Sequence, residues 1–326
     1  MTFYPIQHAI LLIKGIDAKK FLQGQVTCDI DALSDDNSSP VLAPIGAHCT
    51  HKGRVLFSFR ALQLPNIENN EVSEPVIALS TPSDMGDVAL AALQKYSVFS
   101  KVELSLASPP YRILGVQGEE ATQSLRSLLS NTTTKNSGEK DLLPSEPHTA
   151  IHTTLGTIVC VAEASYELWL TEQQAISLTE NTTTSYPLDN NYWHTVMIQS
   201  GLAHVDQSTS GEFTPHDLNY PNIPHAVSFK KGCYTGQEVV ARMHYLGKLK
   251  KHVYLFTAPA NQNEPSINGK SVFSSEKTQA VGTIIDSCIS EQQYIFLALV
   301  TSDYIEQGDL YLDENQTLAI ELLLKE

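Results

Sequence analysis

Short apolar runs separated by polar turns dominate the first third of the chain, and two segments there have helical spacing. Residues 18–23 follow Asp17, a residue type that caps helices. Apolar residues recur every three or four positions from Met85 to Tyr96, after a Thr81-Pro82 pair that predicts a helix start with Thr81 as cap. Strands are predicted at residues 8–13, 41–47, 55–62, 76–79 and 98–104.

A similar order then repeats. A strand at residues 112–116 precedes a helix at 119–129, and strands at 157–162 and 167–170 precede a helix at 172–179. Strands that flank helices in this order are typical of the α+β class, and the two repeats predict two ferredoxin-like units.

After Lys251 the pattern changes to short apolar strands between turn residues: HVYLFTA, AVGTIIDSCI, QYIFLALV and LAIELLL. This pattern predicts a small C-terminal β-barrel. The expected domains are a first α+β unit at 1–108, a second at 109–247 and the barrel at 248–326. Interleaving of the first two units stays open.

The charge of the chain limits its partners. The net charge is −15, which disfavours direct binding to nucleic-acid backbones. Residues 230–251 are the exception, with six basic residues and one acidic residue, which leaves 15 basic against 35 acidic residues elsewhere. The short apolar run near the first residue predicts neither a signal peptide nor a membrane span, so we expect a cytoplasmic protein without membrane contact.

The cysteines do not predict a metal centre. The five cysteines are far apart, and no C-x-x-C pair occurs among them. The sequence therefore predicts no zinc or cluster-ligating site and disfavours a disulfide framework.

Candidate chemistry centres on KKGCYTGQEVVAR, residues 230–242. Thr235 and Glu238 have the spacing of a capping box, which predicts a helix from Gly236 to Leu246 that ends at Gly247. Cys233 would lie near the positive end of that helix and close to two lysines, surroundings that favour a thiolate. An ordinary capped helix without chemistry remains the alternative, since neither His225 nor His244 is an established base for the thiol.

A second candidate is Trp193, on a helix predicted at 192–198. It precedes a long polar segment, GLAHVDQSTSGEFTPHDLNYPNIPHAVSFKKG, and long irregular segments are often functional. Trp193 can be a core residue or a ligand contact, and the pattern alone leaves both open.

FKKGCYTGQEVVAR resembles the K-G-C-Y-x-G-Q-E signature of the YgfZ family, the folate-binding relatives of the glycine-cleavage aminomethyltransferase. The segments IKGIDAKKFLQGQVTCDI, LQKYSVFSKVEL and WHTVMIQSGLAHVDQSTSGEFTPHDLN are also similar to family segments. The resemblance covers most of residues 8–255 and is looser in the C-terminal domain.

The resemblance implies three domains around a central hole that binds tetrahydrofolate or a related reduced folate. It also implies a role in assembling or maintaining iron–sulfur enzymes, such as tRNA methylthiotransferases, and thereby in tRNA modification. These clients would be transient or indirect partners. The family's reactive cysteine corresponds to Cys233. The residues implied in folate binding are His8, Trp193, Lys231, Gly232, Tyr234, Gly236, Gln237, Glu238 and Arg242.

Two departures from the family pattern bear on the chemistry. His8 stands where a second folate-associated tryptophan is expected, and an imidazole offers less area for stacking. Phe57 and Ser58 stand where aminomethyltransferases carry an acidic residue. Without that carboxylate, a cation developing during aminomethyl transfer lacks its partner. This disfavours the alternative function, a folate-dependent one-carbon transferase that uses Cys233.

Overall fold

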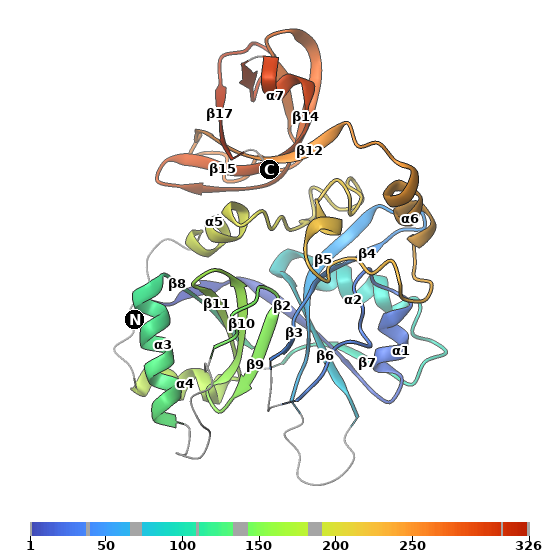
Figure 1. Cartoon of the computed structure of the whole chain (residues 1–326), viewed down its shortest axis with the longest axis vertical. Coiled ribbons are helices and arrows are strands. Elements are labelled where there is room, and N and C mark those ends of the chain that lie inside the picture. The colour runs from blue at the N-terminus through green and yellow to red at the C-terminus, as the bar shows by residue number, and fades with distance from the viewer. Residues whose placement is uncertain are drawn as a thin grey trace. The chain divides into compact units, whose positions relative to one another are not determined.

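The computed structural model describes residues 2–36, 40–65, 74–108, 111–132, 143–181, 191–307 and 309–324 (Figure 1). The chain forms two compact units, each built from several segments. The first unit comprises Met1–Gly46, Phe59–Asn190 and Pro224–Tyr234, and the second comprises Ala47–Ser58, Asn191–Ile223 and Thr235–Glu326. The chain passes from one unit to the other within two strands, β4 (Ile45–Cys49) and β5 (Val55–Gln63).

One five-stranded sheet has the order β4-β5-β6-β2-β7. Its remaining strands are β2 (His8–Lys14), β6 (Val76–Pro82) and β7 (Glu103–Leu106). The helices of this part of the chain are α1 (Ala18–Gln23), η1 (Ser83–Met85) and α2 (Gly86–Gln94). Strand β2 lies between β6 and β7 in this sheet, and its apolar residues Ile10, Leu11 and Ile13 are buried.

The other sheet of the first unit has six strands in the order β1-β8-β11-β10-β9-β3. The strands are β1 (Tyr4–Ile6), β3 (Val41–Leu42), β8 (Arg112–Gln117), β9 (Thr149–Thr153), β10 (Gly156–Ala162) and β11 (Ser165–Leu170). The helices are α3 (Glu119–Thr132) and α4 (Glu172–Asn181). Two of these strands, β1 and β3, come from the range expected to form the first domain, and they pair with β8 and β9.

A buried ion pair lies where the two sheets of the first unit share a core. Arg60 Nε is 3.2 Å from Glu167 Oε2, and both side chains are at most 5% exposed. Glu167 Oε2 also accepts a hydrogen bond from Trp169 Nε1 (3.0 Å), and Arg60 Nη1 donates to Ala43 O (3.0 Å). Burial and the charge of Arg60 lower the pKa of His148 to about 3, so this imidazole is neutral and accepts from Arg60 Nη1 at 3.2 Å. The cluster therefore ties β5 to β11.

The second unit contains the barrel and three helices that precede it. The helices are α5 (Tyr192–Gln199), η2 (Tyr220–Asn222) and α6 (Gln237–Leu246). Six strands close the barrel in the order β12-β15-β14-β13-β16-β17. They are β12 (Lys251–Pro259), β13 (Ser271–Ser274), β14 (Lys277–Ser290), β15 (Gln293–Thr301), β16 (Leu310–Tyr311) and β17 (Ala319–Leu324), and α7 (Asp303–Gln307) follows β15.

The α+β class and the C-terminal barrel are confirmed, whereas the domain boundaries and the central hole stay predictions. No helix in the described ranges combines the length and apolar character needed to span a bilayer.

Several local predictions were wrong. Thr81 does not cap a helix, because it lies in β6 and pairs with Ala9. The strand expected at 98–104 begins only at Glu103, since Val98 and Phe99 are exposed in a turn. The Asp17 side chain does not cap α1, because it accepts a hydrogen bond from Lys101 N instead.

Candidate functional site

The segment before Cys233 packs onto the segment that follows α1, both in the first unit. Thr27 Oγ1 donates to Ala226 O (2.8 Å), and Ser228 N donates to Thr27 O (2.9 Å). Lys231 Nζ donates to Val26 O (2.9 Å) and Cys28 O (2.7 Å). The structure thus joins two segments that are about 200 residues apart and that both carry the family resemblance.

Lys231 is a structural tether in this arrangement. Burial lowers its pKa to about 8, although Cys28 and the carboxylates of Asp29 and Asp31 oppose this shift. Its ammonium lies 5.3 Å from the centre of the Tyr234 ring, which is itself buried. Because two carbonyls already occupy the ammonium, Lys231 holds the loop that carries Cys233.

The capping box prediction was wrong. The N-cap of α6 is Gly236, one residue later than Thr235, so Glu238 is not at the position a capping box requires. Gly236 has a φ of 85°, and a Cβ there would lie 2.5 Å from Thr50 O. A left-handed residue this close to another backbone must be glycine. Backbone geometry therefore explains why position 236 is a glycine.

Cys233 is the exposed thiol of this protein. The other four cysteines are buried, and burial raises the pKa of Cys28 and Cys49 to about 12 and that of Cys160 to about 11. A buried thiol with a raised pKa reacts slowly because both access and the thiolate fraction are low.

We therefore expect Cys233 to react first with iodoacetamide. In a timed alkylation of the folded protein followed by peptide mass spectrometry, Cys233 should be labelled at least about tenfold faster than any other cysteine. Denatured protein, in which all five thiols are accessible, is the control. Faster labelling of Cys28 or Cys49 in the folded state would contradict the prediction.

The other residues of the motif differ in exposure. Gly232, Glu238 and Arg242 are exposed, and Gln237 is half-buried at the start of α6. No neighbouring atom lies within 4 Å of a Cβ placed on Gly232, so that position is open. Their roles in folate binding stay predictions.

Trp193 and His8 lie in different units. Trp193, on α5, is 3% exposed, and its indole Nε1 has no hydrogen-bond partner among the described residues. A buried donor without a partner is costly, so it is suited to a ligand acceptor. His8 is half-buried in β2, with its Nδ1 2.8 Å from Ser80 Oγ. Both stay predictions as folate contacts.

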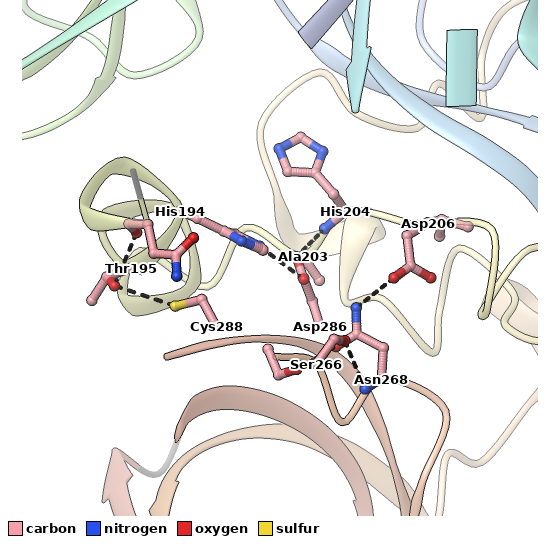
Figure 2. A network of polar contacts seen from close by, with 12 residues as sticks. His194, Thr195, Ala203, His204, Asp206, Ser266, Asn268, Asp286 and Cys288 are labelled. Carbon is pink, nitrogen blue, oxygen red and sulfur yellow. Dashed lines mark hydrogen bonds and ion pairs between the residues drawn. The ribbon is translucent and has the colours of Figure 1, made fainter. Parts of the chain in front are cut away.

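A polar network connects α5, the helix that carries Trp193, to the barrel strand β14 (Figure 2). Asp286 is 2% exposed. Its Oδ1 lies 2.9 Å from His194 Nε2, and its Oδ2 accepts from His204 N at 2.8 Å. Burial disfavours the imidazolium, but the carboxylates of Asp286 and Asp206 outweigh burial and raise the pKa of His194. Asp286 was not among the residues predicted from the sequence, although an acidic residue inside the apolar run AVGTIIDSCI is a usable signal.

The network extends along the loop that follows α5. Asn268 Nδ2 donates to Asp206 Oδ2 (2.8 Å), and Ser287 Oγ donates to Asn268 Oδ1 (2.6 Å). On the helix side, Thr195 Oγ1 lies 3.2 Å from Cys288 Sγ. These contacts fix α5, and therefore Trp193, against the barrel.

Phe57 and Ser58 are fully buried and have structural contacts. The centres of the Phe57 and His48 rings are 5.4 Å apart, and Ser58 Oγ accepts a hydrogen bond from Val205 N at 2.9 Å. Neither side chain can supply the carboxylate of an aminomethyltransferase, so these positions contribute packing.

Known proteins are similar to this chain along nearly its whole length, although no family model matches it. Two curated relatives are both named tRNA-modifying protein YgfZ. The one from Escherichia coli O157:H7 (strain EC4115 / EHEC) is 29% identical over 325 residues, which is 97% of this chain and 90% of the relative. The one from Escherichia coli (strain SMS-3-5 / SECEC) is 28% identical with the same coverage.

The fold also has a solved counterpart. The crystal structure of glycine cleavage system aminomethyltransferase T from Bartonella henselae matches with a TM-score of 0.68 at 14% identity, covering 99% of this chain and 85% of that one. At this identity the match concerns the fold alone. The chain therefore has an aminomethyltransferase-like fold.

Proposed function

Because this chain resembles the YgfZ family along nearly its whole length, we propose that it is a folate-binding accessory protein that supports tRNA modification. The observation that carries the proposal is the similarity over 97% of the chain to curated relatives named tRNA-modifying protein YgfZ. In the finer form of the proposal, the protein binds a reduced folate and maintains iron–sulfur enzymes that methylthiolate tRNA.

Two features of the chain fit a folate. The pterin and benzoyl rings require flat contacts, and Trp193 offers both an aromatic ring and an indole N–H that lacks a partner among the described residues. Gly232 leaves open space beside Cys233. When bound, the folate would supply the one-carbon or redox chemistry of its pterin ring, and the chain's own residues would orient it.

The accessory role is favoured over one-carbon transfer by the residues at positions 57 and 58. Phe57 and Ser58 provide no carboxylate to stabilise a developing cation. Cys233 is exposed, as a thiol that reacts with an external partner must be. We therefore assign Cys233 to the maintenance of client enzymes.

The expected result for folate is a saturable change in Trp193 fluorescence. The chain has two tryptophans, so the variant Trp169→Phe leaves Trp193 as the single reporter. Titration of Trp169→Phe with tetrahydrofolate should change the emission, because ring stacking alters the indole environment. Trp193→Phe is the matched control and should show no such change. No saturable signal and no heat in calorimetry at about millimolar folate would contradict folate binding.

The tRNA role is tested separately in a bacterial strain that lacks its own YgfZ protein. Expression of this chain should restore methylthiolated tRNA, measured by mass spectrometry of nucleosides, and Cys233→Ser should restore much less. Equal restoration by Cys233→Ser would mean that the thiol is dispensable. No restoration by the unchanged chain, at normal expression, would contradict the proposed function itself.

A further inference from the structure

A pocket of the second unit lies among the segment after Phe213, the end of α6 and the start of β12. Its volume is about 370 Å³. Four side chains that can carry positive charge line it: His216, His244, Lys251 and His252. None of the residues assigned to folate binding lines this pocket, so a ligand bound here would be independent of the proposed function.

The charge of this pocket is opposite to that of the protein as a whole. The described residues that line it include no Asp or Glu, whereas the chain carries a net charge of −15. Asp217 follows the pocket residue His216 in the sequence, but its carboxylate contacts residues that do not line the pocket. Its Oδ2 accepts from Thr214 N and Thr214 Oγ1, both at 2.8 Å, and lies 3.8 Å from Arg54 Nη1. Asp217 does not line the pocket, although its charge acts on the neighbouring His216.

Two of the histidines are close enough to act on the same ligand. The ring centres of His216 and His244 are 6.1 Å apart, with an interplanar angle of 45°. His216 is 8% exposed and His244 is exposed. Burial and the nearby His244 lower the pKa of His216, although Asp217 opposes the shift. A negative ligand between the rings would favour the protonated imidazole.

We infer that this pocket binds a small molecule through its phosphate or carboxylate groups. Lysine and protonated histidine are donors without acceptor capacity, and oxyanions are their natural partners. A pocket of this volume is at the small end of ligand sites, which suits a compact anion. A metal is disfavoured, since no group of three or more His, Cys, Asp or Glu side chains in the described ranges could hold one.

The test compares two lysines of the same basic segment. Lys251 lines the pocket, whereas Lys250 does not, and both are exposed. The full chain is titrated calorimetrically with pyrophosphate and with tri-γ-glutamate at about pH 6, below the ordinary pKa of histidine. Lys251→Gln should weaken binding of the preferred anion about fivefold, and Lys250→Gln, with the same loss of charge, less than about twofold. The tighter of the two anions identifies phosphate or carboxylate as the ligand group.

The pH dependence gives an independent readout. Affinity should fall as the pH rises from about 6 to about 8, because a bound anion attracts an imidazolium but not a neutral imidazole, and histidine side chains ordinarily change charge in this range. Equal weakening by the two lysine variants would reduce the effect to general surface attraction and would overturn the inference. The inference would also be overturned if neither anion showed saturable binding at about 10 mM, or if the affinity did not depend on pH.

Discussion

Replacing Arg60 by alanine should lower the free energy of unfolding of the first unit by about 3–5 kcal/mol. Arg60 and Glu167 are both at most 5% exposed, and their charges are 3.2 Å apart. Without the guanidinium, the Glu167 carboxylate keeps its desolvation cost and loses its counter-charge. Urea denaturation followed by far-ultraviolet circular dichroism measures the loss.

Two comparisons separate the buried charge from other effects. Arg54→Ala removes an arginine whose side chain is 47% exposed and whose carboxylate partner is 3.8 Å away, so it should cost less than about 1 kcal/mol. The double variant Arg60→Met/Glu167→Gln removes both charges and keeps an acceptor for Trp169 Nε1. It should regain most of the stability lost in Arg60→Ala. A double variant as unstable as Arg60→Ala would contradict this explanation.

Asp286→Ala should destabilise the second unit by about 2–4 kcal/mol, since it removes a buried carboxylate that accepts from His194 and from the backbone N–H of His204. The His204 N–H would then be buried without its acceptor. Asp286→Asn keeps one acceptor oxygen and should therefore reduce the stability of the second unit less than Asp286→Ala does. Both variants are compared by urea denaturation with Asp303→Ala, an exposed aspartate of the same unit.

The effect of Asp286→Ala should also depend on pH. The pKa of His194 is raised in the folded protein, so the stabilisation from its proton is complete below the unfolded value and is lost as the pH rises through the folded value. The difference between wild type and Asp286→Ala should therefore shrink from about pH 6 to about pH 8.5. A difference that grows over this range would contradict the assigned His194–Asp286 pair.

The same network holds the helix that carries Trp193 in position. Because α5 is held to β14 through His194 and Thr195, loss of Asp286 should disturb Trp193 although it does not remove the indole. The folate proposal thus depends on barrel residues that show no family signature in the sequence.

Local patterns in the sequence determined much of the architecture. The bounds of α1 were predicted at both ends, and the apolar strands after Lys251 predicted the barrel, because each depends on residues adjacent along the chain. The sequence singled out Cys233 as the reactive thiol, and the structure shows that this thiol is exposed, whereas its reactivity stays a prediction. By contrast, the capping box at Thr235 was wrong, since the close approach of Gly236 to Thr50 sets where α6 begins.

Only the tertiary structure decided which distant residues act together. The sequence places Lys231 close to a thiol, but only the structure shows that its ammonium donates to the carbonyls of Val26 and Cys28, some 200 positions away. Asp286 lies in a strand, as its apolar surroundings in the sequence predict, but only the structure shows that it is the acceptor for His194 and His204. Periodicity reports which face of an element is apolar. It carries no information on which buried polar group meets which, because each such pairing is made by the packing of segments from separate parts of the chain.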